Sequence, residues 1–300
     1  MSFIVLEPGL YSLLVDQGRP RQRSLGVPIG GAADREAWAL GNALIGNPPG
    51  SVALEVTLYG PRLKALKTVG AVVYGAPFRV EKNGQRLRPG VPFTVQKDDE
   101  LLIAETMTQL RAYLCVTGGF ASPLILGSRS SLGPIVHRQR LECASGTAAR
   151  RFILNAGSHH DRRPLRLLSC PGSDAMLGLA DQWFVVQPLS DRTGIRLAGP
   201  AIRPGIGDIV SEPVAPGTIQ VTPSGELLIL GIDAQAIGGY PKAGHVVSAD
   251  FGRLAQLRPG DCVKFKEVSF EEAEQAFDRQ ERQLREWLTR LGEPAPLGPS

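Results

Sequence analysis

The sequence predicts a mainly β protein of two domains with few helices. Its 300 residues contain many short apolar runs of strand length, rich in Val, Ile, Leu, Phe and Tyr. The 35 glycines and 24 prolines exceed the usual share and indicate many turns between short strands. Only two stretches repeat apolar residues at helical spacing. The length of 300 residues suits two domains of roughly 150 residues each.

Each expected strand is an apolar run bounded by turn residues. In the first half these runs are Phe3–Leu6, Leu10–Val15, Val52–Thr57, Ala71–Tyr74, Pro77–Lys82, Phe93–Gln96, Glu100–Ala104 and Leu110–Val116. In the second half they are Leu165–Ser169, Trp183–Val186, Ile195–Leu197, Asp208–Ser211, Thr218–Val221, Leu227–Ile232, His245–Ser248 and Cys262–Lys266. Asn83-Gly84 predicts a two-residue hairpin, because both turn positions need a positive φ. Pro259-Gly260-Asp261 predicts a turn before the last strand.

Two helices are expected. Asp34 is a suitable N-cap for a helix over Arg35–Ile45, with Asn42 on the side opposite its apolar stripe. Ser269 and Glu272 form a capping box for a second helix that reaches Leu291. Its expected apolar face comprises Phe270, Ala273, Phe277, Leu284, Leu288 and Leu291. That stripe would pack across both domains or face another chain.

The domain boundary is expected near residue 165. A polar stretch from Gly127 to Arg163 has the weakest strand signal, which is typical of a functional loop or of a boundary. The expected domains are residues 1–165 and 166–291. Residues 292–300, rich in Pro and Gly, are expected to form a disordered tail.

Charge and hydropathy disfavour several classes of protein. The net charge of +4 is small and dispersed, which does not favour nucleic-acid binding. The longest apolar runs, such as Leu227–Leu230, are far shorter than the ~18 residues of a membrane helix. The amino terminus lacks the basic region of a signal peptide, so a cytoplasmic protein is expected. In that compartment the four cysteines are expected to be free thiols: Cys115, Cys143, Cys170 and Cys262.

Several motifs of cofactor and nucleophile chemistry are absent. The sequence has no Walker A loop, no glycine-rich dinucleotide fingerprint, no G-x-S-x-G and no H-E-x-x-H. Ala-Met-Lys-Met is also absent, so the chain is not expected to carry its own biotin. His159-His160 is interpreted as a pair of exposed loop residues, because consecutive side chains diverge and rarely bind one ion. No metal site is expected.

Three polar segments in the chain suit a ligand site, and two of them suit an anion. Asp16-Gln17-Gly18-Arg19 follows an apolar strand, and its two charged residues suit either a ligand or an ion pair across a turn. Leu126-Gly127-Ser128-Arg129-Ser130 places two hydroxyls around an arginine. In Ser190–Leu197, an extended chain would place Arg192 and Arg196 on one face beside Asp191. That pair suits a carboxylate or phosphate, or a surface ladder of ion pairs.

A fourth segment suits an amide-like ligand. Gln220 lies amid apolar strand residues, and a buried amide needs hydrogen-bond partners. Asp233 and Gln235 project from the end of an apolar strand, where ligand loops usually lie. Gly238-Gly239 allows a close backbone approach, and Tyr240-Pro241 would form a stiff wall beside it.

These segments belong to a longer ordered set of motifs. The set comprises Asp16–Arg19, Gly26-Val27-Pro28, Gly31-Ala32-Ala33-Asp34, Asn42, Gly46-Asn47, Leu54-Glu55, Gly60-Pro61, Gly118-Gly119, Leu126–Ser130, Ser190-Asp191-Arg192 with Gly194 and Arg196-Leu197, Ser211-Glu212, Pro216-Gly217 with Ile219-Gln220-Val221, Gly238–Pro241 and Gln256–Asp261. Each motif is weak alone, but their order over residues 10–267 is specific. By this set the chain resembles the KipA/PxpC family, also called allophanate hydrolase subunit 2 or the biotin-dependent carboxyltransferase family.

The resemblance implies two tandem cyclophilin-like β-barrels and a partner of the KipI/PxpB type. In the family, such pairs serve bacterial 5-oxoprolinase, which hydrolyses 5-oxo-L-proline to L-glutamate with ATP. That enzyme also needs a third, LamB/YcsF (PxpA)-like subunit. A related module in urea carboxylase moves a carboxyl group from carboxybiotin to urea. KipA-like proteins, a third type, counter a KipI-type kinase inhibitor.

The resemblance also indicates which residues bind substrate. They are Arg129, Asp191, Arg192, Arg196, Gln220, Asp233, Gln235, Gly238, Gly239, Tyr240 and Pro241, with Asp16, Arg19, Asp34, Asn42, Glu55 and Ser128 as secondary candidates. We expect the main polar set to converge on one cleft, and no residue stands out as catalytic. The chain departs from the family pattern at Thr193, Ile195, Thr222 and Ala236, which alters the expected pocket more than the fold.

Three functions remain open at this point. The first is a PxpC-like subunit of an ATP-dependent 5-oxoprolinase, with ATP bound through the complex and arginines holding carboxylate or phosphate. The second is a carboxyltransferase subunit that binds biotin carried by another protein, with the amides and carboxylate of the fourth segment facing the ureido ring. The third is a non-catalytic protein that binds a KipI-like partner. Without an activated nucleophile, the isolated chain is expected to be folded but inactive until a PxpB-like subunit joins it.

Overall fold

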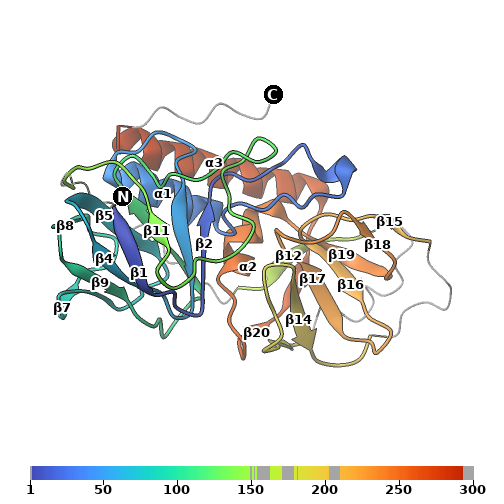
Figure 1. Cartoon of the computed structure of the whole chain (residues 1–300). Coiled ribbons are helices and arrows are strands. Elements are labelled where there is room, and N and C mark those ends of the chain that lie inside the picture. The colour runs from blue at the N-terminus through green and yellow to red at the C-terminus, as the bar shows by residue number, and fades with distance from the viewer. Residues whose placement is uncertain are drawn as a thin grey trace. The chain divides into compact units, whose positions relative to one another are not determined.

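The computed structural model describes residues 2–148, 151, 153, 163–170, 179–180, 182–202 and 210–292. The chain divides into two compact units (Figure 1). Unit 1 is formed by Met1–Gly18, Asp34–His160 and Glu281–Ser300, and unit 2 by Arg19–Ala33 and Asp161–Gln280. This division differs from a single boundary near residue 165, because one early segment joins unit 2 and the end of the last helix joins unit 1. The expected tail lies outside the described residues, except for Gly292.

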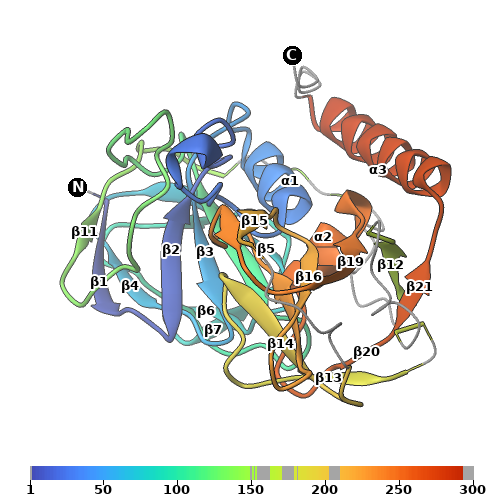
Figure 2. The ribbon, with the colours of Figure 1, turned by 90° about the vertical axis from the view of Figure 1, so that its right-hand side faces the viewer.

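Unit 1 holds two antiparallel sheets around one core (Figure 2). The first sheet, in spatial order, contains β11 (Arg140–Leu141), β1 (Phe3–Glu7), β4 (Arg62–Ala65), β9 (Glu100–Ile103), β6 (Val80–Lys82) and β7 (Gln85–Leu87). The second contains β2 (Tyr11–Val15), β3 (Ala53–Thr57), β10 (Arg111–Val116), β5 (Val69–Gly75) and β8 (Phe93–Val95). Val5 and Leu63 of the first sheet meet Val56 and Leu114 of the second in a shared buried core.

Helix α1 (Arg35–Ile45) packs against β5 and β10. It has the predicted bounds and the predicted cap, since Asp34 Oδ1 accepts a hydrogen bond from the Ala37 N–H at 3.0 Å. Gly41 allows the close approach of helix and sheet. A Cβ at this position would lie only 2.8 Å from Sγ of Cys115.

Unit 2 holds one eight-stranded sheet that curls back on itself. In spatial order it contains β20 (Cys262–Val263), β13 (Phe184–Val186), β14 (Gly194–Ala198), β17 (Leu227–Leu230), β16 (Thr218–Val221), β19 (Lys242–Val246), β12 (Leu165–Leu168) and β21 (Phe265–Glu267). The first and last strands of this order are separated in sequence by Lys264 alone, so the sheet forms a nearly closed barrel. Its core includes Ile219, Ile229, Phe184 and Phe265.

Short elements complete unit 2. A two-stranded sheet pairs β15 (Glu212–Pro213) with β18 (Ile237–Gly238). The short helices are η1 (Arg23–Leu25), η3 (Ser248–Asp250) and α2 (Phe251–Ala255). The prediction of a mainly β protein with few helices is therefore confirmed. Among the described residues, no helix is both long and apolar enough to cross a membrane.

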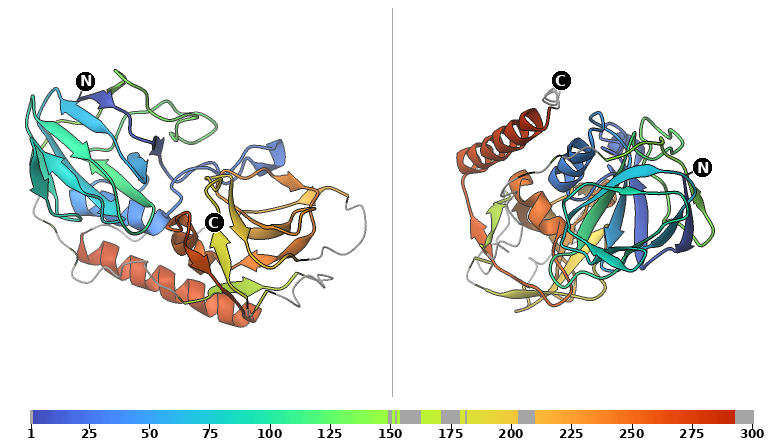
Figure 3. Two further views of the ribbon diagram at one scale, coloured as in Figure 1. Left: turned by 90° about the horizontal axis from the view of Figure 1, so that it is seen from below. Right: turned by 90° about the vertical axis from the view of Figure 1, so that its left-hand side faces the viewer.

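Helix α3 (Phe270–Arg290) is one continuous helix (Figure 3). It begins at the predicted capping box, where the Ser269 N–H donates to Glu272 Oε2 at 2.8 Å and the Glu272 N–H donates to Ser269 Oγ at 3.2 Å. The expected apolar face is confirmed near its end, where Leu288 and Leu291 are buried.

The expected apolar face of α3 is wrong at its two phenylalanines. Phe270 and Phe277 are 63% and 42% exposed. Ala273 is buried as expected, and Ala276, which was not expected on this face, is buried beside it in a small cluster with Val268. The small alanine side chains let the start of the helix lie close to Val268. The two phenylalanines point away from this cluster, because both are exposed.

The strand predictions were accurate where apolar residues dominate. Asn83 and Gly84 have φ values of 50° and 76° and join β6 to β7 as expected. The strand expected at His245–Ser248 begins earlier, as β19. The strand expected at Asp208–Ser211 is absent from its described part, residues 210–211, and its other residues lie outside the described chain, as does His159-His160. Strands β4, β11, β15 and β18 were not expected, because they are partly polar or only two residues long.

Candidate functional site

A row of side chains crosses the outer face of the unit 2 sheet. The pairing of β14, β17, β16 and β19 aligns Arg196, Leu228, Gln220 and Lys242 as lateral neighbours. Side chains in register share one face, and adjacent strands lie about 4.8 Å apart. Arg196 and Gln220 are therefore roughly 10 Å apart on one face. The core residues Ile219 and Ile229 occupy the opposite face.

Gln220 is buried beneath the β15–β18 sheet. Its Nε2 donates to the carbonyl oxygen of Tyr240 at 3.5 Å, while Oε1 has no hydrogen-bond partner among the described residues. A Cβ on Gly238 would lie 2.4 Å from Nε2 of Gln220, so any larger residue where the chain closes over the amide would displace the amide. A buried acceptor without a donor costs roughly 1–3 kcal/mol. Gln220 Oε1 therefore retains an unused acceptor position inside unit 2.

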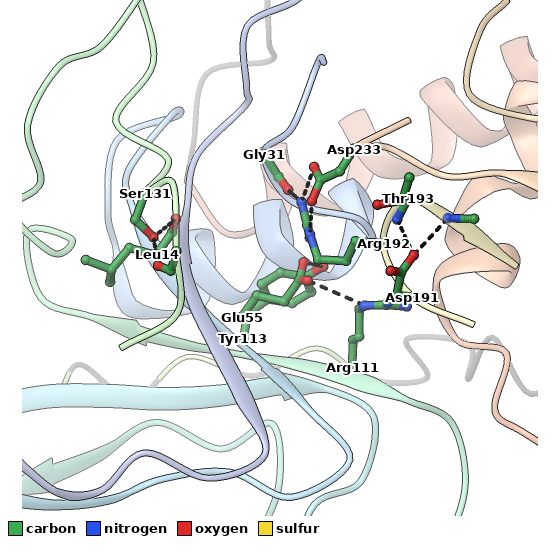
Figure 4. A network of polar contacts seen from close by, with 12 residues as sticks. Leu14, Gly31, Glu55, Arg111, Tyr113, Ser131, Asp191, Arg192, Thr193 and Asp233 are labelled. Carbon is green, nitrogen blue, oxygen red and sulfur yellow. Dashed lines mark hydrogen bonds and ion pairs between the residues drawn. The ribbon is translucent and has the colours of Figure 1, made fainter. Parts of the chain in front are cut away.

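A charged pair joins the turn before β14 to the turn that follows β17. Arg192 donates from Nε to Asp233 Oδ2 at 2.7 Å and from Nη2 to Oδ1 at 3.0 Å, and Nη2 also donates to the carbonyl oxygen of Gly31 at 2.7 Å (Figure 4). The side chain of Arg192 is 6% exposed and that of Asp233 29%. The guanidinium is thus engaged inside unit 2, and the carboxylate is the more accessible partner.

The prediction that Arg192 and Arg196 share one face of a strand is wrong. Strand β14 begins only at Gly194, because Asp191 closes a turn before it. Asp191 Oδ1 accepts hydrogen bonds from the N–H groups of Thr193 at 2.7 Å and Gly194 at 3.0 Å. Arg192 lies in that turn and is buried, whereas Arg196 lies on the strand and is exposed.

The segment Arg19–Ala33 contains Arg23, which was not among the predicted site residues. Arg23 donates to the carbonyl oxygens of Gln235 at 3.0 Å, Ala234 at 3.4 Å and Val214. Gln235 thus contributes its main-chain oxygen here, and the residue as a whole is exposed. Nothing in the sequence around Arg23 signalled this role, because its three partners lie about 190 to 210 residues away.

A second contact of the same segment lies next to Asp233 in the chain. The Gly30 N–H donates to the carbonyl oxygen of Ile232 at 3.1 Å. A Cβ at Gly30 would lie 3.6 Å from Arg19 Nη1 and 3.7 Å from Asp233 Oδ1. Arg19, a secondary candidate, is therefore close to the accessible carboxylate.

In unit 1, Asp16 is a buried hydrogen-bond acceptor. Its Oδ1 accepts from Ser128 Oγ at 2.6 Å, Ser130 Oγ at 2.7 Å and the Gly18 N–H at 2.8 Å, and Oδ2 accepts from the Arg129 N–H at 2.6 Å. Burial alone would raise the pKa of Asp16, but these donors outweigh burial and lower it. Two secondary candidates, Asp16 and Ser128, thus hold the chain around Arg129 in place.

A second buried network in unit 1 joins Asp34 and Glu55. The Tyr113 hydroxyl donates to Glu55 Oε2 at 2.8 Å and accepts from the Asp34 N–H at 2.7 Å, and Arg111 Nε lies 3.4 Å from Glu55 Oε1 (Figure 4). Burial, together with the nearby carboxylates, raises the pKa of Tyr113 well above its ordinary value. All four side chains are buried, so this network stabilises the unit.

The expectation that Asn42 lies outside the core is wrong. Asn42 is 3% exposed. Its Nδ2 donates to the carbonyl oxygens of Trp38 at 3.2 Å and Ser51 at 3.1 Å, and its Oδ1 accepts from Asn47 Nδ2 at 2.8 Å. The amide joins the end of α1 to a following turn, and this satisfies polar groups that burial would otherwise leave unpaired.

Within unit 2, several expected site residues lie together. Arg192 pairs with Asp233, and Gln220 contacts Gly238 and Tyr240. Arg129 belongs to unit 1, so the convergence of the whole set stays a prediction. In the part of the chain that the structure describes, no group of three or more His, Cys, Asp or Glu could hold a metal. The unit 2 face therefore offers an exposed guanidinium, a carboxylate and a buried amide oxygen.

Comparison with known proteins gives matches over most of the chain. Residues 25–267 match the family model described as "Carboxyltransferase domain, subdomain A and B". The chain is 31% identical to a protein of Haemophilus influenzae that is named as a 5-oxoprolinase subunit, over 90% of this chain and 92% of that protein. It is 28% identical to the protein of the same name in Escherichia coli, over 96% of this chain and 98% of that one.

Longer proteins contain a similar stretch. The "Urea amidolyase" of Saccharomyces cerevisiae is 25% identical over 91% of this chain but only 17% of its own length. The solved protein TTHA0988 is 33% identical, with a TM-score of 0.81 over 88% of this chain, which spans about half (55%) of that chain. The urea carboxylase of Kluyveromyces lactis shares the fold with a TM-score of 0.83 at 23% identity, over 100% of this chain and 30% of that one.

Proposed function

This chain belongs to the family of carboxyltransferase domains that comprise a subdomain A and a subdomain B. We propose that it is the PxpC-like subunit of an ATP-dependent 5-oxoprolinase. The proposed reaction converts 5-oxo-L-proline, ATP and water to L-glutamate, ADP and phosphate. One observation carries this choice. The two relatives named as 5-oxoprolinase subunits match along 92% and 98% of their own length, whereas the S. cerevisiae urea amidolyase matches along 17%. The match thus covers nearly the whole of each of these two relatives.

The outer face of unit 2 suits the substrate chemically. 5-Oxoproline carries a carboxylate, a lactam N–H and a lactam carbonyl. The exposed guanidinium of Arg196 fits the carboxylate, because paired N–H donors match two carboxylate oxygens. The accessible carboxylate of Asp233 and the unpartnered Oε1 of Gln220 are acceptors for the N–H.

The proposal assigns this chain to binding and polarisation of the lactam. Neither cluster described above contains a nucleophile beside a base, so the activating group comes from elsewhere in the complex. ATP would phosphorylate the lactam oxygen, which turns a stable amide into one that water can attack. We assign ATP binding to the complex. The proposed partners are a KipI/PxpB-like subunit and a LamB/YcsF (PxpA)-like subunit.

Reconstitution tests the proposal. The chain is purified alone and with the products of neighbouring genes, and ADP and glutamate are measured with and without 5-oxoproline. We expect equal formation of ADP and glutamate only in the complete mixture. Robust turnover by the chain alone, or a complete complex that never hydrolyses 5-oxoproline, would contradict the proposal.

A second candidate is a carboxyltransferase subunit that uses biotin carried by another protein. The match to a carboxyltransferase family model over residues 25–267 favours it. The same acceptors would then face the ureido N–H groups of biotin. Urea-dependent loss of carboxyl from carboxybiotin, without 5-oxoproline hydrolysis, would support this candidate instead. Binding to a KipI-type inhibitor with neither activity would support a regulatory role.

A further inference from the structure

The loop of residues 121–140 in unit 1 exposes an unusual number of aliphatic side chains. Leu124, Ile125 and Leu126 are 63%, 36% and 50% exposed, and Leu132 and Val136 are 79% and 60% exposed. These five residues lie within twenty consecutive positions. Clustered apolar exposure of this kind marks an interaction site more often than scattered single residues do.

The loop is held firmly although its side chains are exposed. The Ser131 N–H donates to the carbonyl oxygen of Leu14 at 2.9 Å, and the Ile135 N–H donates to that of Ser12 at 2.8 Å (Figure 4 shows Ser131 beside Leu14). Closer to Arg129, the buried Asp16 accepts four hydrogen bonds, three from residues 128–130 of the loop and one from Gly18. The backbone that carries the aliphatic residues is thus pre-organised.

The tip itself is a strained tight turn. Ile125 and Ser128 exchange main-chain hydrogen bonds of 2.8 and 3.1 Å. Between them Leu126 has a φ of 50°, a conformation that a leucine rarely adopts. Strain of this kind often persists where a defined surface is needed for binding. Here it holds three aliphatic side chains in solvent.

The charge of the loop indicates the chemistry of its partner. Residues 121–140 contain three arginines and no acidic residue. Neither Arg129 nor Arg138 forms an ion pair with a carboxylate in the described parts of the chain, and both are exposed. Arg129 Nη1 donates to the carbonyl oxygen of Ser122 at 2.7 Å, which orients the guanidinium without neutralising it. A complementary surface would therefore be apolar at its centre and acidic at its rim.

A hollow beside the loop adds to this complementarity. A pocket of about 500 Å³ is lined by Ala121 and Arg129 of the loop together with Ser51, Phe120 and Glu142. It is large enough to accept side chains from a partner. The surface thus combines projecting aliphatic groups with an adjacent hollow, as is common in protein interfaces.

We infer that the 121–140 loop is the docking surface for a partner protein whose matching face is an apolar pocket rimmed by carboxylates. A two-fold contact between copies of this loop is disfavoured, because it would bring arginines together. A membrane surface is disfavoured because the loop has no Trp, Tyr or Phe to anchor it at an interface. The relatives named as 5-oxoprolinase subunits agree with a protein partner. The inference rests on the proposed function only for the identity of that partner.

The test measures binding separately from catalysis. The probe is the KipI/PxpB-like protein encoded beside this chain, titrated against the full chain by calorimetry. The double variant Leu124→Ser with Leu126→Ser is expected to weaken the affinity at least tenfold, because buried aliphatic anchors dominate interface energies. The control double variant, Met107→Ser with Leu189→Ser, removes side chains that are 82% and 80% exposed elsewhere, and it is expected to change the affinity less than twofold. Circular dichroism verifies that both variants are folded.

A second variant tests the charge complementarity. Arg129→Gln is expected to weaken binding at low salt and to reduce the dependence of affinity on salt, since one charge pair is lost. Unchanged affinity in the leucine variant, or no binding of the wild-type chain to the probe, would overturn the inference. So would loop-dependent binding to phosphatidylserine vesicles, or loop-dependent dimerisation, without partner binding. A complex that forms through the loop yet never hydrolyses 5-oxoproline would support the surface and contradict the proposed reaction.

Discussion

Two aspartates follow apolar strands, one in each unit, and their environments differ sharply. Asp16 comes directly after β2 in unit 1 and is 6% exposed. Its oxygens accept hydrogen bonds from two serine hydroxyls and two main-chain N–H groups. Asp233 comes three residues after β17 in unit 2, and its side chain is 29% exposed and paired with Arg192.

The difference separates a structural carboxylate from one that can bind a ligand. Asp16 is surrounded by neutral donors, and four hydrogen bonds account for about all the acceptor positions a carboxylate has. Asp233 has a buried cation on one side and solvent on the other. The same local pattern in sequence, an acid after an apolar strand, therefore serves an internal anchor in one unit and an accessible site in the other.

The largest expected effect is the loss of the Asp16 anchor. Asp16→Ala leaves two buried hydroxyls and two N–H groups without their acceptor, and we expect unit 1 to lose about 3 kcal/mol of stability. Urea unfolding followed by the fluorescence of the buried Trp38 measures this change. Glu142→Ala, at an exposed carboxylate of the same unit, is the control and should change stability by less than about 0.5 kcal/mol. A loss below about 1 kcal/mol for the Asp16 variant would contradict the anchor role.

In unit 2, breaking the charged pair should have a smaller effect. Arg192→Ala removes the hydrogen bonds to Asp233 and to Gly31, but the remaining carboxylate is partly solvated. We expect about 2 kcal/mol of local destabilisation, less than the roughly 3–5 kcal/mol for a fully buried pair, because Asp233 is partly exposed. Faster hydrogen exchange of the amides after β17 would show it, while Arg196→Ala should leave their exchange unchanged. Equal exchange in both variants would mean that Arg192 is not a structural contact.

Much of the fold could be predicted because its signals are local. Helix α1 matched its predicted bounds, since its N-cap and its apolar spacing lie within a dozen residues. The Asn83-Gly84 turn was predicted for the same reason. The packing of Arg19–Ala33 with unit 2 could not be predicted, because it depends on contacts with segments that are distant in the sequence.

The candidate site was predictable by residue type and not by orientation. Asp233 and Gln220 stood out as polar residues in apolar surroundings, and the structure gives each a specific partner. Arg192 and Arg196 looked equivalent at a spacing of four, yet a turn closed by Asp191 buries one and exposes the other. Arg23 carried no signal at all, because its three carbonyl partners lie far away in sequence.

The contribution of Asp16 should depend on pH in a defined direction. Its pKa is lower in the folded chain than the ordinary value of 3.8, so the folded state binds this proton less readily than the unfolded state. The stabilisation is therefore complete above about pH 4 and is lost as the pH falls through the folded pKa. The part of the unfolding free energy that depends on the charge of Asp16 is smaller than the total loss expected for Asp16→Ala. The stability gap between wild type and Asp16→Asn should narrow from pH 7 to pH 3, and a gap that widens would contradict the assignment.

The smallest expected change in stability concerns Arg196, and it isolates binding from folding. Its guanidinium is exposed on β14 and has no side-chain partner among the described residues, so Arg196→Gln should alter stability by less than about 0.5 kcal/mol. If Arg196 holds the substrate carboxylate, as we propose, the assembled complex should show a roughly tenfold higher KM for 5-oxoproline, equal to about 1.4 kcal/mol of binding. Lys266→Gln, at an exposed cation elsewhere in unit 2, should leave KM unchanged. Because uniform loss of substrate binding raises KM and leaves kcat intact, a fall in kcat alone would assign Arg196 to a different step.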